Sequence, residues 1–292
     1  MPVTDTPLRY PGGKTQLAAF VGELLTLNKL QGGHYAEPFA GGAGIAWRLL
    51  FSGQASEIWL NDIDPAIYAF WKSVINDTDK LCDRIRDVNV TIDEWHRQRT
   101  IFRKTRVNAL DRAFAALFLN RTNRSGILDG GVIGGLDQKG NYKIDCRFNK
   151  KDLIRKIERI GKYRSLIHIS NDDAKTCLAR WDSQLPERTL LNIDPPYYGK
   201  GSELYTNYFK PADHASLSEQ VLRLEHRWMM TYDDVPEIEA LYRSRPTYRT
   251  SLLYSVQTKR RGTELLITDE RLAIPISSNK FDPIEEPCRL AA

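Results

Sequence analysis

The sequence predicts an α/β protein with a mostly parallel sheet, a mainly helical insertion and a terminal antiparallel hairpin. Strand and helix patterns alternate over residues 1–78 and resume at residue 165, as in sheets with helical crossovers. Residues 79–164 follow mainly helical patterns, and two strand-like runs without a helix between them come late in the chain. We therefore expect residues 1–78 and 165–292 to form one domain, which residues 79–164 interrupt.

The first part of the chain has the order strand, helix, strand, helix. These elements are expected over residues 33–37, 45–51, 57–61 and 65–74. Pro65 suits the first turn of the last helix, because a backbone donor is not needed there. This order is the βαβ rhythm of a parallel sheet.

A glycine-rich loop over residues 126–140 interrupts the helical pattern of the insertion. Long loops in compact proteins are usually functional or disordered. After the insertion we expect three more strands, over residues 166–170, 189–193 and 228–232. Two late strands, over about 248–256 and 264–268, are expected to form the hairpin, with the basic polar stretch 258–262 as their connection.

The positive charge of the chain is concentrated in the insertion. Residues 97–164 hold 18 Lys and Arg against 6 Asp and Glu, a net charge of +12, whereas the whole chain carries +5. The rest of the chain therefore carries −7. A basic segment on an otherwise acidic protein indicates a polyanionic partner, which favours nucleic acid. A solvated helical surface is the alternative interpretation.

Composition argues against membrane, secreted and metal-binding classes. No apolar run approaches the roughly 20 residues of a membrane span, and no signal peptide pattern is visible. The cysteines form no CxxC pair, which indicates free thiols in a reducing cytoplasm and no zinc site. They are Cys82, Cys146, Cys177 and Cys288. The five histidines are dispersed, so we expect no metal centre.

The motif Asp194-Pro195-Pro196-Tyr197 directly follows the expected strand over residues 189–193. Open α/β sheets bind ligands at the carboxyl ends of their strands. The two prolines stiffen the turn. The carboxylate and a proline carbonyl can accept both hydrogens of an exocyclic amino group, while the tyrosine ring stacks on a planar base. A proline-rich turn that only closes the strand is the alternative.

A glycine turn over residues 37–44 joins the first strand to the next helix. Such a turn lets the backbone approach a ligand closely. Asp62, at the end of the second strand, is well placed for ribose hydroxyls, so the pair suits a cofactor that contains adenosine. The turn lacks the dinucleotide pattern GxGxxG, and a purely structural turn is the alternative.

The segment Gly12-Gly13-Lys14-Thr15 is not a phosphate-binding loop. Such a loop requires a glycine five positions before Gly13, where this chain has Leu8, and a preceding strand. Lys14 can instead neutralise a carboxylate, and Tyr10 can stack on a ring.

Taken in order, these motifs resemble the Dam-type N6-adenine DNA methyltransferases, alpha group. The chain reads RYPGGKTQL, EPFAGGAG, NDIDP, a basic insertion with FLNRTNRSG, DPPY and then TELLI. The resemblance implies a Rossmann-like class I methyltransferase sheet, S-adenosylmethionine as methyl donor and adenine N6 in DNA as acceptor. Ala43 stands where the family usually has its second glycine, with Gly42 and Gly44 on either side.

The resemblance also implies roles for individual residues. The catalytic set is Asp194, Pro195, Pro196 and Tyr197. The cofactor-binding set is Tyr10, Lys14, Glu37, Pro38, Phe39, Gly41, Gly42, Gly44, Asp62, Ile63, Asp172 and Asp194. Asp173 competes with Asp172 for the place near the cofactor adenine.

We expect the insertion to recognise the DNA target. The candidate contacts are Arg97, Arg121, Asn123, Arg124, Lys139 and Arg147. Arginine and asparagine can read guanine and adenine in the major groove, whereas capping the helix or touching phosphates is the alternative. The target base lies inside the duplex and must be flipped out.

The expected partner is double-stranded DNA, without a membrane. The site of action is the cytoplasm of a bacterium, or of a phage host. A monomer is expected, and a cognate restriction enzyme remains open. One rival function is methylation of an amino group in RNA, in cytosine or in a protein side-chain amide. The other is DNA binding by a relative without catalytic activity.

Overall fold

The computed structural model describes residues 4–10, 13–199, 209–256, 258–275 and 281–283. Within this part of the chain the strands form one eight-stranded sheet in the order β3-β2-β1-β4-β5-β7-β6-β8. The strands are β1 (Gly33–Glu37), β2 (Ala55–Asn61), β3 (Ile167–Ser170), β4 (Thr189–Ile193), β5 (Arg227–Asp233), β6 (Thr247–Val256), β7 (Thr258–Thr268) and β8 (Phe281–Pro283).

Strands β1 to β5 pair in parallel, and β5, β7, β6 and β8 pair antiparallel. The predicted α/β class with a mostly parallel sheet is thus confirmed. The five strands expected before the hairpin all form, because buried apolar runs such as β4 can lie between two helical layers.

The hairpin differs from the prediction in two ways. The stretch 258–262 is not a connection but the first part of β7, paired with β6 from Val256↔Thr258 onward. A strand can continue past its hydrophobic segment because antiparallel pairing uses only main-chain groups. The hairpin also does not end the sheet, since β8 pairs with β6.

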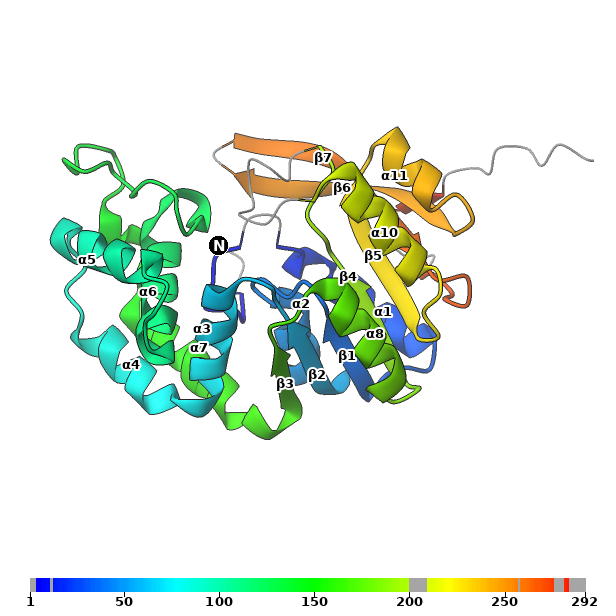
Figure 1. Cartoon of the computed structure of the whole chain (residues 1–292), viewed down its shortest axis with the longest axis horizontal. Helices are drawn as coiled ribbons and strands as arrows, with labels where there is room; N and C mark the ends of the chain where they lie inside the picture. The colour runs from blue at the N-terminus through cyan, green and yellow to red at the C-terminus, as the bar shows by residue number, and fades with distance from the viewer. Residues whose placement is uncertain (1–3, 11–12, 200–208, 257, 276–280, 284–292) are drawn as a thin grey trace, which may run out of the picture.

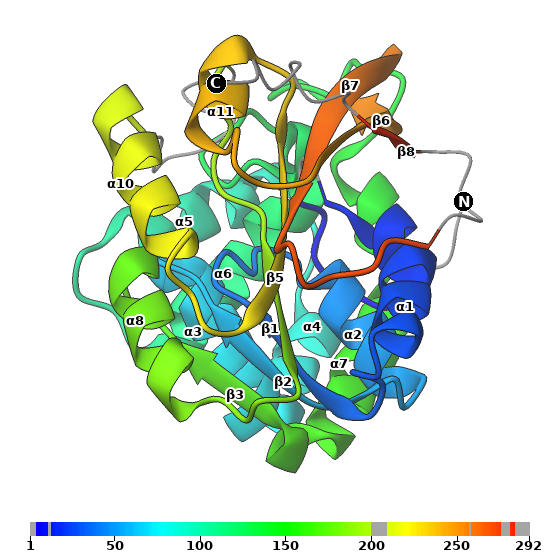
Figure 2. The same cartoon turned by 90° about the vertical axis from the view of Figure 1, so that its right-hand side faces the viewer.

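Helices cover both faces of the sheet (Figures 1 and 2). One face packs with α1 (Ala18–Leu27), α2 (Gly44–Phe51) and α3 (Pro65–Asn76) in one hydrophobic cluster. The other packs with α8 (Ala174–Gln184), α10 (Pro211–Val221) and α11 (Pro236–Leu241) in a second cluster. Asp64 caps α3 by accepting from the N–H of Ala66, and Pro65 occupies its first turn as predicted.

The insertion is mainly helical, as predicted. It contains α4 (Thr78–Asp87), α5 (Ile92–Arg103), α6 (Ala109–Thr122) and α7 (Lys150–Lys162). It also contains short 3₁₀ turns at Arg124–Gly126 and Ile144–Arg147 and ends in another, Arg164–Leu166. A further 3₁₀ turn, Thr15–Leu17, precedes α1 outside the insertion. Buried residues of the insertion, such as Phe114 and Leu153, belong to the same hydrophobic cluster as Phe70 of α3. The insertion therefore shares its core with the sheet domain.

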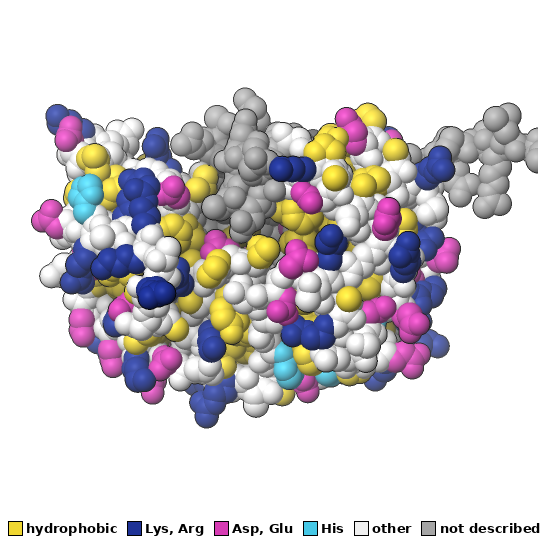
Figure 3. Space-filling view, in the orientation of Figure 1, with side chains coloured by type: hydrophobic (Ala, Val, Ile, Leu, Met, Phe, Trp, Pro, Cys, Tyr) yellow, Lys and Arg dark blue, Asp and Glu magenta, His cyan; other side chains and the backbone are white. Residues whose placement is uncertain are grey.

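The glycine-rich loop and the β6–β7 hairpin rise on the same side of the molecule, on either side of the N-terminal segment (Figure 1). Lys and Arg side chains gather over the insertion on the left of the face in Figure 3, whereas acidic and basic side chains alternate over α8 and α10. No helix among the described residues is long and apolar enough to cross a bilayer.

Candidate active site

The DPPY turn begins where β4 ends and is held by β5. The hydroxyl of Thr231 donates to Asp194 Oδ1 at 2.7 Å. The carboxylate of Asp233 accepts from the N–H groups of Tyr198 (2.9 Å) and Gly199 (2.7 Å). These bonds fix both ends of the turn, so the orientation of Asp194 is set by the neighbouring strand.

A buried lysine lies against the motif. Lys14 Nζ is 3.5 Å from Asp194 Oδ1 and 3.4 Å from Glu264 Oε1, with only 4% of the side chain exposed. It also lies 4.8 Å from the ring centroid of Tyr197, whose hydroxyl donates to Glu264 Oε1 at 2.6 Å. Lys14 thus neutralises carboxylates, as expected from the sequence, but the groups it contacts belong to the DPPY motif and to β7.

Glu264 is the buried acid of this cluster, with 1% of its surface exposed. Burial raises the pKa of Glu264 to about 7, while Lys14 favours its charged form and Asp194 disfavours it. Its second oxygen, Oε2, has no hydrogen-bond partner among the described residues.

A second buried acid, Glu37, ends β1 next to β4. Tyr35 donates its hydroxyl to Glu37 Oε1 at 2.9 Å. Burial raises the pKa of Glu37 to about 8, although the bond from Tyr35 favours the charged form. Within the described part of the chain Glu37 has no ion pair, and Asn192 Oδ1 nearby has no hydrogen-bond partner.

The glycine turn is closed by the N-terminal segment. Gly41 has a φ of +46°, and a Cβ there would lie 2.7 Å from ring atoms of Tyr10. A Cβ on Gly44 would lie 2.1 Å from Thr15 Oγ1. Larger residues at either position would push this segment away. Ala43 adopts the left-handed conformation despite its side chain, with a φ of +48°.

Asp62 braces this turn. Its Oδ2 accepts from the N–H of Gly41 at 2.8 Å and its Oδ1 from the N–H of Asp64 at 2.9 Å. Burial raises the pKa of Asp62 to about 7 against the effect of these two bonds. Ile63, next along the chain, is 46% exposed.

Asn61 ties three strand ends together. Its Nδ2 donates to the carbonyls of Pro38 and Asp172, both at 3.0 Å, and its Oδ1 accepts from the hydroxyl of Ser170. Asp173 caps α8 by accepting two backbone N–H groups. Asp172 forms an ion pair with Arg180 at 2.6 Å and lies where β3 ends.

The structure brings most of the predicted catalytic and cofactor residues together at the carboxyl ends of the parallel strands. Phe39 packs edge-on against Phe209 beside the DPPY turn. Sequence reasoning did not assign roles to Asn61, Thr231, Asp233 and Glu264. Asn61 and Asp233 end β2 and β5, and Glu264 lies in the TELLI stretch, which are the signals in the sequence that point to these three residues.

The predicted DNA contacts fall into two groups. Asn123 is buried; its amide donates to the carbonyls of Ile127 and Leu128 and accepts from Trp95. Arg121 donates to the carbonyl of Arg147, and burial lowers its pKa to about 10. The side chains of these two residues therefore make contacts within the protein, which fits a role in capping the helix better than a role in reading bases.

Of the other candidates, Arg147 is half-buried, whereas the remaining three lie toward solvent. Arg124 is exposed at the rim of a hollow of about 490 Å³ between α5 and the glycine-rich loop, which Trp95 and Leu136 also line. Arg97 and Lys139 are exposed and pair with the nearby acids Glu94 and Asp137, respectively.

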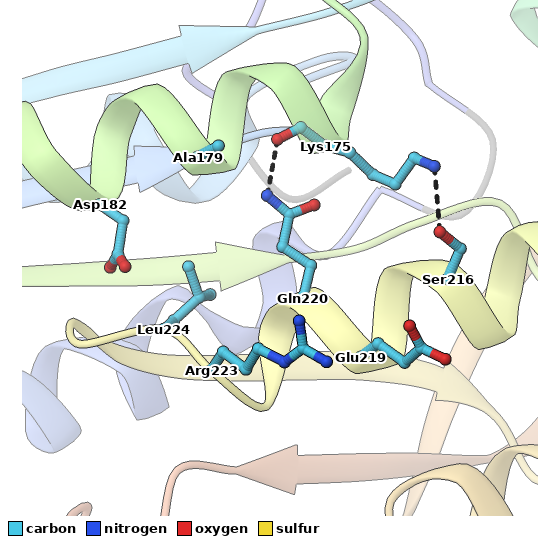
Figure 4. Close-up of a pocket in the computed structure, with 8 residues that line it drawn as sticks. All are labelled: Lys175, Ala179, Asp182, Ser216, Glu219, Gln220, Arg223 and Leu224. Carbon is cyan, nitrogen blue, oxygen red and sulfur yellow. Dashed lines mark hydrogen bonds between the residues drawn. The ribbon is translucent and has the colours of Figure 1, made fainter.

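Another hollow, of about 470 Å³, lies between α8 and α10 (Figure 4). Across it Gln220 Nε2 donates to the carbonyl of Lys175, and Lys175 Nζ donates to Ser216 Oγ. It contains none of the predicted site residues. No cluster of three or more potential metal ligands occurs among the described residues, and Cys288 lies outside them.

The mostly parallel sheet, the glycine turn after β1 and the DPPY motif after β4 together define a methyltransferase that acts on amino groups. The chain belongs to the D12 class N6 adenine-specific DNA methyltransferase family, whose model matches residues 10–261. Its reaction is therefore methylation of adenine in DNA. The predicted function and enzyme class are confirmed at this level.

The chain is similar to two known proteins. The Type II methyltransferase M.MjaIII of Methanocaldococcus jannaschii is 26% identical over 239 residues, which cover 75% of this chain and 80% of the relative. A solved structure of a candidate RNA methyltransferase from Pyrococcus horikoshii is 10% identical over 89% of this chain and 84% of that chain, with a TM-score of 0.42. A likeness of that size supports no statement about substrate.

Proposed function

We propose that the protein transfers the methyl group of S-adenosylmethionine to N6 of an adenine flipped out of a specific site in double-stranded DNA. The observation that carries the proposal is the fixed position of Asp194. Its Oδ1 accepts from Thr231 and faces Lys14, and its Oδ2 has no hydrogen-bond partner among the described residues. A carboxylate oxygen held in this way is ready to accept a hydrogen from an amino group.

Residues at the carboxyl ends of β1 and β2 fit the methyl donor, S-adenosylmethionine. Glu37 is a buried acid without a cation beside it among the described residues, and an ammonium group would supply the missing charge. Asp62 keeps lone pairs for hydroxyl groups after its two backbone bonds. The exposed side chain of Ile63 offers an apolar surface to a ring. A bound S-adenosylmethionine supplies a methyl group on a cationic sulfur.

Asp194 and the proline carbonyls prepare the acceptor. The amino nitrogen of adenine is a poor nucleophile because its lone pair is delocalised into the ring. Hydrogen bonds from that group to Asp194 and a proline carbonyl favour a pyramidal nitrogen whose lone pair is available. Tyr197 stacks on the flipped base. Positioning of this kind supplies much of the rate of a reaction between two bound molecules.

We further propose that the insertion grips the duplex. Its net charge of +12 gives a salt-sensitive attraction to phosphates, and exposed arginines such as Arg124 contact base edges. Arg97, Lys139 and Arg147 serve the phosphates in this proposal. The protein acts as a monomer in the cytoplasm, where its DNA is, and a restriction enzyme with the same target remains a compatible partner.

The test is transfer of a labelled methyl group by the wild-type protein and by the Asp194→Ala variant. We expect the wild type to methylate duplex DNA and not RNA, and Asp194→Ala to lose activity by a factor of about 1000 or more. Methylation-aware sequencing of DNA from expressing cells then gives the target site. Near-normal turnover by Asp194→Ala, or preferential methylation of RNA, contradicts the proposal.

A further inference from the structure

Glu264 connects three parts of the chain that are far apart in sequence. It lies on β7, its Oε1 accepts from the hydroxyl of Tyr197 at 2.6 Å, and the same atom lies 3.4 Å from Lys14 Nζ. Lys14 belongs to the N-terminal segment, and Tyr197 follows β4. Through Lys14, Glu264 is also linked to Asp194, whose Oδ1 is 3.5 Å from the ammonium group.

The main chain fixes where Glu264 stands. Asp233 of β5 is its register partner on one side, and Thr250 of β6 is its partner on the other. A central position in three paired strands leaves a side chain little freedom. The acid therefore has a defined place from which it can hold groups that come from the turn and the N-terminal segment.

The charges explain why an acid is needed at this position. Lys14 is almost fully buried, and a buried ammonium group requires opposite charge nearby. Asp194 alone would have to meet this need, which would draw its carboxylate toward the lysine and away from a base. Glu264 supplies a second negative charge, so Asp194 is left to interact with the acceptor.

We propose that Glu264 is a positioning residue for the acceptor base: it holds the ring of Tyr197 and the ammonium group of Lys14, and so keeps Asp194 oriented toward the adenine amino group. This inference rests on the proposed function. Its buried Oε2 has no hydrogen-bond partner among the described residues, whereas the bond from Tyr197 and the ion pair with Lys14 both involve Oε1.

The test uses Glu264→Gln, which has the same shape but no charge. Its amide oxygen makes a weaker bond with Tyr197 and no ion pair with Lys14. We expect kcat to fall by about 100-fold, with the KM for DNA within about twofold, because only the reacting geometry is lost. The second readout needs no methyl donor: with 2-aminopurine in place of the target adenine, fluorescence on binding should rise less than with the wild type.

Two further variants separate this role from a general loss of stability. Asp269→Asn removes another buried acid, which lies just after β7 and pairs with Arg271 away from the site; its kcat and fluorescence should equal those of the wild type. Tyr197→Phe removes only the hydroxyl that Glu264 holds, and should reproduce part of the loss. Wild-type kcat and fluorescence in Glu264→Gln, while Asp194→Ala is inactive, overturn this inference and leave the proposed function intact. An equal loss in Asp269→Asn overturns it as well.

Discussion

The charged residues of the DPPY site and those of the insertion are organised in opposite ways. At the site, Lys14, Glu264 and Glu37 are buried, and their polar contacts come from β1, β7, the N-terminal segment and the turn after β4. In the insertion, Arg97, Lys139 and most other cations are exposed, and the ion pairs of Arg97 and Lys139 are with acids two or three residues away. Buried charges cost much when a partner is removed, and exposed pairs contribute little. The site should therefore respond strongly to single substitutions and the insertion weakly.

The largest expected effect on stability is at Lys14. Lys14→Met removes the cation between Asp194 and Glu264 and leaves two carboxylates facing each other. We expect the free energy of unfolding to fall by about 3–5 kcal/mol, as measured by denaturant titration. Lys139→Met, on the insertion, is the matched control and should change it by about 0.5 kcal/mol at most. Equal effects of the two variants would remove the contrast between the regions.

A second test follows the pH dependence of stability in Glu37→Gln. The folded pKa of about 8 lies above the ordinary value of 4.5. This acid therefore contributes stability that is complete below pH 4.5 and is lost as the pH rises through about 8. Without ligand, the wild type should lose on the order of 2–4 kcal/mol relative to Glu37→Gln across that window, because one pKa unit is worth about 1.4 kcal/mol.

Thermal or chemical unfolding of both proteins from pH 5 to pH 9 provides the measurement. The stability difference between the two proteins should widen from the acid end up to about pH 8 and then level off, because above that pH the carboxyl is ionised in both the folded and the unfolded wild type. A stability difference that stays constant over the whole range would show that Glu37 does not titrate in this way.

The smallest expected effect is on base discrimination by Arg124 of the insertion. If Arg124 reads a base, Arg124→Ala should reduce discrimination at one position of the target by about 1–3 kcal/mol. Lys139→Ala, as a phosphate contact, should weaken binding about equally on all sequences and lower the salt slope by about one unit. Methylation rates on a panel of singly substituted sites, at two salt concentrations, distinguish the two patterns. An unchanged preference in Arg124→Ala would assign recognition to other residues of the glycine-rich loop.

Much of the fold follows from local sequence patterns, because each parallel strand is an apolar run between turn signals. The position of Asp194 could be predicted as well, because a motif that follows a buried parallel strand lies at the carboxyl ends of the strands, where ligands bind. The first half of β7 was missed because its pairing with β6 does not depend on a hydrophobic pattern. Asp233 and Glu264 were not assigned because their roles depend on register with distant strands. Asn123 shows the reverse problem: a residue type suited to reading bases is used to fix the start of the glycine-rich loop.

The shared hydrophobic cluster of the insertion and α3 has a practical consequence for retargeting. An engineer who exchanges residues 79–164 for the equivalent part of a relative would expose the face of Phe70 and its neighbours to side chains of the wrong shape. On the proposed role of the insertion in target recognition, specificity is therefore not a detachable module. A successful chimera would carry α3 along with the insertion and place its junctions at β2 and β3, and redesign within the native scaffold would best be confined to the rim residues of the hollow beside α5.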